Sequence, residues 1–296
     1  MNFIIKSGIL FWMICNILTT VTIAQDLKET LKFADSQFES GNYKLALKEY
    51  QRVLFFNDGS NLQYIYEQIG SSFFFKKDFK KAAYYYELSY KTAKSESIKT
   101  EILFKKAACY MLDKNFKLAT FELMNLPDSL DLQSTNRKNF YFAVCYWGLE
   151  DFEKSKSSFL NILPIDQVSA RKEITLLFSK KRNLEKPNPK TAQILSIFLP
   201  GSGQIYSGDV KNGINSLALT GGIVLLGVYM TRYYSLFDAV LTVFPWFIRY
   251  HQGGYQGAKE IAQNKRAKKR NDTYQNILKV IQESSIKTER KAKEGY

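Results

Sequence analysis

The sequence predicts an all-α protein in which a helical solenoid is followed by a transmembrane helical hairpin. The first observation is a pattern repeated between about Leu31 and Pro164, in which an aromatic residue is followed three positions later by a small one. The second is a change of composition after residue 190, where stretches begin that are apolar enough to enter a bilayer. The third is an apolar N-terminal segment with the features of a secretory leader.

Residues 1–24 are expected to form a signal peptide. Lys6 supplies the positive charge, Gly8–Leu18 the short apolar core, and Thr22-Ile23-Ala24 a small-residue cleavage site. An uncleaved anchor helix is the alternative, and in either case the segment that follows is expected to be exported. Lipidation of Cys15 is rejected, because the residue before it is not small.

Four repeats are expected within residues 25–181. The small anchor residue recurs at positions 46, 82, 119 and 155, in steps of 36, 37 and 36 residues. A small residue lies twelve positions before each anchor and a large one four positions after it; these are Ala34, Gly70, Ala107, Ala143, Tyr50, Tyr86, Leu123 and Phe159. A fixed period of this length predicts stacked units of two helices each.

This pattern resembles the tetratricopeptide repeat family over a little under half of the chain. The resemblance implies a right-handed superhelix with a concave groove that holds a protein or peptide partner. The family's groove positions, carried over to this chain, are Tyr64, Glu67, Ser71, Phe74, Phe104, Met111, Tyr141 and Trp147. Exposed aromatic side chains at the centre of such a groove are the expected contacts, and the alternative is that half of them pack under a cap helix.

Two segments close this region. Asp166 to about Lys181 is expected to be the terminal cap helix of the solenoid, because Ile174, Leu177 and Phe178 fall at helical spacing. Residues 182–190 are charged and broken by prolines, which is typical of a linker.

Residues 191–257 are expected to form a membrane domain with two transmembrane helices and a Pro/Gly-rich loop. Gly213–Met230 has no charged residue and is about long enough for a span, and Ser235–Tyr250 is a weaker second span. Ile194–Ile205 is expected either to cross as a short third segment or to re-enter the membrane.

The Pro/Gly-rich loop resembles the Leu-Pro-Gly-x-Gly-Gln-x-Tyr-x-Gly signature of small bacterial membrane domains of unknown function. The matching residues are Leu199, Pro200, Gly201, Gly203, Gln204, Tyr206 and Gly208. The resemblance covers roughly residues 191–257 and implies a membrane location behind tetratricopeptide repeats, without an activity.

Asp238 is an ionisable residue inside the second expected span. Such a group is costly in a bilayer and is a functional candidate by default, here facing Gln204, Tyr206 or Arg232 along a path for ions or protons. The alternative is a position near the end of the span, paired with Arg232.

Residues 258–296 are expected to form a basic amphipathic tail. Eleven Lys/Arg and five Asp/Glu lie in residues 259–296, within a chain of net charge +14. The cluster Lys265–Arg270 indicates either binding to anionic lipid head groups or a solvated helix end. A cleaved leader and two spans put the tail outside the cytoplasm, whereas the positive-inside rule favours the cytoplasm, so its side stays open.

No catalytic constellation, metal site or cofactor loop is expected, so the chain is not predicted to be an enzyme. His251 is the only histidine and is expected in a capping turn, while Cys109 and Cys145 are expected to be buried free thiols. Asp209 stands where a phosphate loop requires lysine. Nucleic acid is not an expected partner, because an exported protein would be separated from the nucleic acids of the cytoplasm.

The sequence therefore predicts a membrane-anchored scaffold for protein–protein interaction in the bacterial inner membrane, with the repeats on the periplasmic side. Its expected partners are a protein or peptide in the repeat groove and the lipid bilayer. The alternative is an oligomeric membrane pore or transport-associated subunit, assembled as a homo-oligomer through the repeats.

Overall fold

The computed structural model describes residues 27–180 and 184–294, and all of the regular secondary structure in these ranges is helical. This confirms the predicted all-α class. The internal contacts divide the chain into two compact units, one ending at Asn161 and the other beginning at Ile162. The leader predicted at residues 1–24 lies outside the described residues.

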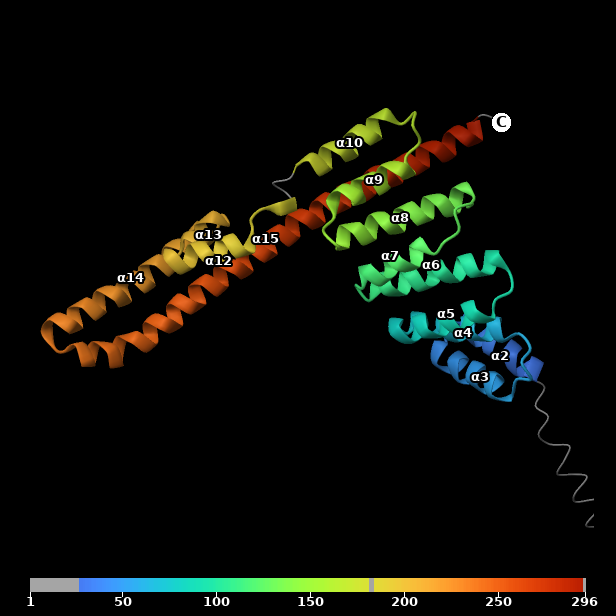
Figure 1. Ribbon diagram of the computed structural model, residues 1–296, viewed down its shortest axis with the longest axis horizontal. Coiled ribbons are helices and arrows are strands. Elements are labelled where there is room, and N and C mark those ends of the chain that lie inside the picture. Colours follow the sequence, from blue (N-terminus) through green and yellow to red (C-terminus); the bar gives the residue numbers. More distant parts are fainter. Residues whose placement is uncertain (1–26, 181–183, 295–296) are drawn as a thin grey trace, which may run out of the picture. The chain divides into compact units, whose positions relative to one another are not determined.

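The described part of the first unit is a series of helix pairs in which each helix packs against its neighbours in sequence (Figure 1). We call the earlier helix of each pair the first helix and the later one the second helix. The first helices are α2 (Leu27–Glu39), α4 (Leu62–Phe75), α6 (Glu96–Leu112) and α8 (Leu132–Gly148). The second helices are α3 (Tyr43–Phe56), α5 (Phe79–Thr92), α7 (Phe116–Met124) and α9 (Phe152–Ile162).

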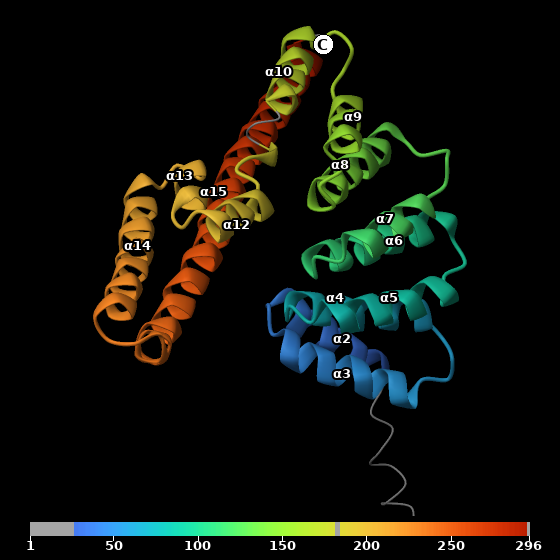
Figure 2. The same cartoon turned by 60° about the vertical axis from the view of Figure 1, so that its left-hand side comes forward.

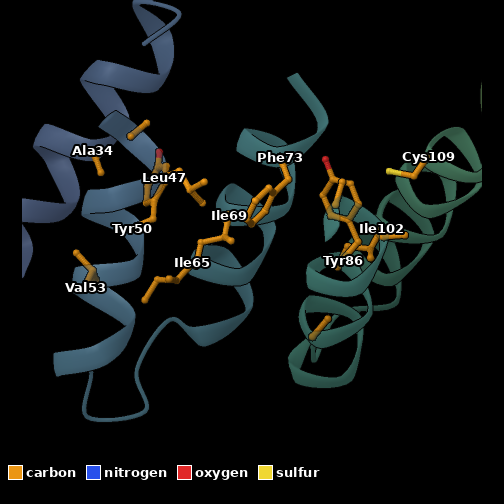
Figure 3. Packing of buried hydrophobic residues seen from close by; sticks show 14 residues of the cluster. Ala34, Leu47, Tyr50, Val53, Ile65, Ile69, Phe73, Tyr86, Ile102 and Cys109 are labelled. Atoms are coloured by element: carbon orange, nitrogen blue, oxygen red, sulfur yellow. The ribbon is translucent and has the colours of Figure 1, made fainter. Parts of the chain in front are cut away.

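The repeated positions of the sequence form the contacts inside these pairs. Each second helix begins at the aromatic residue of the pattern, and every small and large residue predicted to recur around the anchors is buried. Figure 3 shows the result in the first part of the array, where Tyr50, Ile69 and Tyr86 lie among buried side chains from successive helices. The small residues allow close approach of the backbones, and the large ones fill the space between them.

The turn inside each pair is the same in all four repeats. The second residue after the first helix has a positive φ, and the next backbone N–H donates to a carbonyl oxygen five residues earlier at 2.8–2.9 Å. The positive-φ residues are Gly41, Lys77, Lys114 and Glu150. This is the Schellman arrangement that ends helices, and it brings the second helix back against the first.

The second unit contains one long helix and several shorter ones that pack on it. The helices are α10 (Val168–Ser179), α12 (Pro189–Phe198), α13 (Ser202–Tyr206), α14 (Val210–Tyr233) and α15 (Leu236–Glu294). Helix α14 packs against the first part of α15, and α12 and α13 lie at the end of this pair away from the α14–α15 turn (Figure 2).

Among the described residues, α14 is the one helix long and apolar enough to cross a membrane, with a mean hydropathy of 1.6. The second span predicted at Ser235–Tyr250 is not a separate element, because α15 continues without a break from Leu236 to Glu294. The predicted boundary at residues 257/258 thus falls inside this helix. Gly253, Gly254 and Gly257 near it do not end the helix. Of these, Gly254 lies where α15 packs closely, because a Cβ there would come within 2.8 Å of Ser216 Oγ.

Three other segments differ from the sequence prediction. Helix α10, predicted as the cap of the solenoid, packs on α15 and belongs to the second unit. The predicted linker 182–190 packs where it is described, because Leu184 is buried and its carbonyl oxygen accepts from Arg270 Nε at 2.6 Å. Residues 194–205 are divided between α12 and α13, and the ten-residue α12 is about 15 Å long, half of a bilayer core.

Candidate binding surfaces

The groove residues predicted from the sequence are less accessible than expected. Phe104 is fully buried, with the Arg137 guanidinium 4.2 Å from its ring centroid and Tyr141 in edge contact. The prediction of Phe104 as an exposed contact is therefore wrong, because this ring fills the space between α6 and α8. Ser71 is also buried, with its hydroxyl 3.1 Å from that of Tyr86.

The other six predicted groove residues are half-buried. Tyr64 and Glu67 interact with neighbouring helices, Tyr141 packs against Phe104, and Trp147 packs edge-on against Phe152. These side chains line the first helices, as the sequence predicted. Tyr64, Glu67 and Tyr141 contact the first helix of a neighbouring repeat, whereas Phe74 and Trp147 pack against the second helix of their own repeat.

A row of polar contacts connects the four first helices, and we call it the ladder. It consists of Asp35, Tyr64, Glu67, Lys105, Glu101 and Arg137. Tyr64 donates to Asp35 at 2.8 Å, Lys105 to Glu67 at 2.5 Å, and Arg137 to Glu101 at 2.8 Å, so each contact joins one first helix to the next. Burial and the hydrogen bond to Asp35 raise the pKa of Tyr64 to about 12. The ladder therefore presents fixed charges of both signs along one row.

A second polar cluster lies deeper, between α5, α6 and α7. Lys106 is buried and donates to Glu87 at 2.6 Å, and its Nζ lies 2.8 Å from Glu122, which is also buried. Burial opposes the charge of Lys106, but its bonds to Glu122 and Glu87 outweigh this effect, so its pKa is raised. The same bonds lower the pKa of Glu87 against the effect of burial. The three side chains form an ion triad between three helices, in which Lys106 and Glu122 are buried and Glu87 is partly exposed.

The sequence analysis missed an apolar surface on α7. Leu118, Phe121 and Met124 are 44%, 59% and 62% exposed, although the opposite side of the same helix is buried in the core. Tyr84, at the position of α5 equivalent to Phe121, is also exposed. The sequence did contain a signal for this surface. Leu118, Phe121 and Met124 are spaced by three residues, so they form a second apolar side on this helix.

The Pro/Gly-rich motif forms the junction of α12, α13, α14 and α15. Ser196 Oγ accepts from the Gly203 N–H and donates to Gln204 Oε1, both at 2.9 Å. Gln204 Nε2 in turn donates to the Gly254 carbonyl at 2.8 Å. A Cβ on Gly203 would overlap the Ala192 carbonyl oxygen, so glycine is required there by the close approach of two backbones. Tyr206 accepts at its hydroxyl from the Asn188 N–H at 3.2 Å.

The remaining residues of this motif have structural positions as well. Gly201 has a φ of 91° and faces the Gly213 backbone, and Pro200 precedes it between α12 and α13. Gly208 has a φ of 78° and its carbonyl accepts from Lys265 Nζ at 3.2 Å. The motif residues therefore hold helices together, and two of their hydrogen-bond partners, Ser196 and Gly254, lie outside the motif.

Asp238 lies far from this junction. It is the third residue of α15, where its carboxylate accepts from the Ser235 hydroxyl at 2.7 Å. Gln204 contacts the same helix sixteen residues later, at Gly254, which is about 24 Å along a helix. Asp238 and Gln204 are therefore too far apart to face each other, as the functional prediction for Asp238 had supposed.

The histidine and cysteines have ordinary packing roles. His251 lies inside α15, not in the predicted turn, and its Nε2 is 3.0 Å from the Ile197 carbonyl oxygen. Cys109 and Cys145 are free and buried, as predicted, and burial raises the pKa of their thiols to about 12 and about 11. Among the described residues, no group of three or more His, Cys, Asp or Glu side chains is arranged to hold a metal ion.

Comparisons with known proteins do not assign the chain to a family. No family model matches the chain, no curated protein matches it, and no solved structure matches it. The candidate surfaces are therefore judged by their own geometry: the ladder, the α7 surface and the junction beside the apolar helix α14.

Proposed function

We propose that the chain is a membrane-anchored scaffold of the tetratricopeptide type, whose first helices hold a protein or peptide partner while α14 and the first part of α15 insert in the bilayer. The observation that carries the proposal is the ladder. Its charged side chains are held in place by each other, so a partner would meet a surface whose side chains need little further ordering.

The ladder suits recognition better than it suits stability. Its ion pairs are partly exposed, with 35% and 20% of the Lys105 and Glu67 side chains accessible, and such pairs contribute only about 0–1 kcal/mol. Arg137 stacks on Phe104 while it bonds to Glu101, so its guanidinium has a fixed direction. Fixed charges of both signs give orientation and specificity to a bound segment.

The proposal is tested by photo-crosslinking in cells, with the probe at Glu101, Met111 or Trp147 on the first helices and at Tyr84 or Phe121 on the second helices. One dominant adduct, formed only from the first helices, is the expected result. The same adduct formed only from Tyr84 and Phe121 would move the partner to the α7 surface. Adducts only between copies of the chain would contradict the scaffold and favour the self-assembling alternative.

A matched pair of substitutions on α6 sharpens this test. Lys105→Ala breaks a ladder contact between two helices, whereas Lys99→Ala breaks the Lys99–Glu96 pair within one helix. Both variants lose one positive charge, so a general charge effect would lower partner capture equally in both. Selective loss in Lys105→Ala is the expected result.

For the location, we propose the bacterial inner membrane with the repeats on the periplasmic side, as the N-terminal leader suggests. The packing of α10 on the far part of α15 keeps residues 168–179 and the tail on one side of the bilayer. A single cysteine at Ser97, in a chain whose native cysteines are replaced, tests the side. Labelling by an impermeant maleimide after permeabilisation of the outer membrane alone supports the periplasm. Protection until the inner membrane is broken would place the repeats in the cytoplasm, as the basic tail favours.

A further inference from the structure

A hollow of about 580 Å³ lies between the beginning of α12 and the middle of α15, and we call it the basic hollow. The side chains that define it are Lys190, Gln193, Ile194, Lys259, Gln263 and Arg266. Lys259, Gln263 and Arg266 are spaced by four and three residues, so they share one side of α15. Gln193 and Ile194 lie three and four residues after Lys190, so these three residues also share one side of α12. The hollow is therefore formed by two regular helix surfaces, not by a loop.

The helices that carry these side chains are held close together. Ala192 of α12 packs with Ala258 and Ala262 of α15, and all three are fully buried. Alanine at each position leaves little distance between the two helix axes. The long side chains that flank this contact are consequently brought to one place.

The charge of the hollow is entirely positive. Its lining includes two lysines and one arginine, and no carboxylate belongs to it. Within the described parts of the chain, none of Lys190, Lys259 and Arg266 forms an ion pair. The start of α12 adds the positive end of its helix dipole, since Pro189 is its first residue. An anion would thus find three cations and two amide side chains together.

A neighbouring hollow provides a contrast within the same unit. It is also lined by three cations, here Lys186, Lys265 and Lys269, but its lining includes the carboxylate of Glu185. Lys265 in addition donates to the Gly208 carbonyl at 3.2 Å. Part of its positive charge already has a partner, so the basic hollow is the stronger site for an external anion.

The basic hollow lies at the level of one end of α14. Gly254 of α15 faces Ser216 of α14. Lys259 is five residues beyond Gly254, and Val210 is six residues before Ser216, so both lie about 8–9 Å from that contact in the same direction. If α14 crosses a bilayer, the hollow is therefore at the depth of the lipid head groups.

An apolar surface continues from the hollow along α12. Ile194 is 54% exposed, and Phe198, one turn later, is 84% exposed. The polar hollow and this apolar surface together match a molecule with an anionic head and hydrocarbon chains. A free phosphate would use only the first part of the surface.

We propose that the basic hollow binds the phosphate group of an anionic phospholipid, whose acyl chain lies along Ile194 and Phe198. Arg266, Lys190 and Lys259 contact the phosphate, and Gln193 and Gln263 hydrogen-bond to the remaining head-group oxygens. This inference rests on the membrane insertion in the proposed function, and it goes beyond that function by assigning a specific lipid site at the start of α12.

The test uses the full chain in phosphatidylcholine nanodiscs that contain a minor amount of photoreactive phosphatidylglycerol. The expected adducts lie on the peptide 190–198. The triple variant Lys190→Gln, Lys259→Gln and Arg266→Gln is expected to lower their yield at least about tenfold, because each cation near an anionic head group contributes a severalfold preference. The matched control, Lys186→Gln, Lys265→Gln and Lys269→Gln, removes the same charge and is expected to keep most of the yield.

Three results would overturn the site. Equal loss in both triple variants would show a diffuse attraction to the whole basic surface. Equal labelling by photoreactive phosphatidylcholine would show that the head-group charge is not read. Complete competition by millimolar inorganic phosphate, without loss by Phe198→Ser, would show that free phosphate is the ligand. Separately, release of the wild-type protein from membranes by alkaline carbonate would contradict the membrane insertion itself, so the two failures are distinguishable.

Discussion

The two units use the same joint between helices but fill its surroundings differently. In the repeats, residues 41, 77, 114 and 150 have a positive φ between the two helices of a pair, and the second helix begins two residues later. In the second unit, Gly208 has the same conformation, and the Asp209 N–H donates back to the Gln204 carbonyl at 2.8 Å. Asp209 then caps α14 as Asp78 caps α5. The same turn geometry therefore connects helices in the repeats and in the second unit.

The difference lies in what packs beside the joint. In the repeats, side chains such as Tyr50 and Tyr86 fill the space between helices, and three of the four joints tolerate lysine or glutamate at the positive-φ position. In the second unit, backbones meet directly, because a Cβ on Gly201 or Gly203 would overlap a carbonyl oxygen. The repeats are thus held by side-chain packing, and the junction of the second unit by close backbone approach.

The largest effect is expected from the ion triad of the first unit. Lys106→Met leaves the buried carboxylate of Glu122 without its cation, which costs about 3–5 kcal/mol. The double variant Lys106→Met with Glu122→Met removes both charges and is expected to recover most of this loss. Hydrogen exchange over residues 79–124 measures both. No recovery in the double variant would mean that the triad contributes packing that methionine cannot supply.

The junction of the second unit is expected to respond next most strongly. Gly203→Ala forces α13 away from the Ala192 carbonyl, and overpacking of this kind costs about 1–3 kcal/mol. Gly221→Ala is the matched control in α14, because no atom lies within 4 Å of its Cβ position. Thermal unfolding in detergent is expected to shift for Gly203→Ala alone. Equal shifts would contradict the close backbone approach.

Alkaline pH is expected to destabilise the first unit more than the second. Cys109 and Cys145 lie in the first unit, and the described part of the second contains no cysteine. Burial raises both thiol pKa values from 9.0, to about 12 and about 11. A thiol whose pKa is higher in the folded state than in the unfolded state contributes its full stability to the fold below pH 9. This stability is lost as the pH rises from 9 toward the pKa of the folded state. Each thiol is expected to cost about 1 kcal/mol between pH 9 and 10, because the unfolded thiol is already half ionised at pH 9.

The check is the rate of maleimide labelling in a chain in which Cys15 is replaced by serine. Labelling of both remaining thiols is expected to be slow at pH 8 and to accelerate above pH 9 as the repeats open. A Cys109→Ala and Cys145→Ala variant is the control for stability, and its alkaline unfolding is expected to be shallower. Fast labelling at pH 8 would show that the thiols are accessible in the folded protein.

The smallest effect concerns the joints themselves. Lys114 has a φ of 59°, which is unfavourable for a residue with a Cβ, so Lys114→Gly is expected to stabilise by about 0.5 kcal/mol. Gly41→Ala is expected to destabilise by about 1 kcal/mol, because a φ of 77° is unfavourable for a residue with a Cβ. No atom lies within 4 Å of the Cβ position, so this cost comes from the backbone conformation alone. Urea unfolding of the full chain, followed by circular dichroism, measures both. A loss on Lys114→Gly would show that the Lys114 side chain is needed at the joint.

The repeats were the most predictable part of the molecule. Their spacing identified every helix pair and the buried anchors, because packing between adjacent units repeats with the sequence itself. The exposure of Phe104 was predicted incorrectly, since a groove position in one helix also faces the next helix. The Arg137 side chain that covers Phe104 lies 33 residues away in the sequence. The α7 surface was missed because periodicity was read for one side of that helix only.

The sequence by itself determined the all-α class, the register of the four repeats and the apolar length of α14, because these depend on local periodicity and composition. Only the tertiary structure decided that α15 continues through Gly253 and Gly254, that α10 packs on it, and that Lys190 meets Lys259 and Arg266. These features depend on contacts between residues far apart in the sequence, such as Gln167 with Ser284, and no local pattern specifies such contacts.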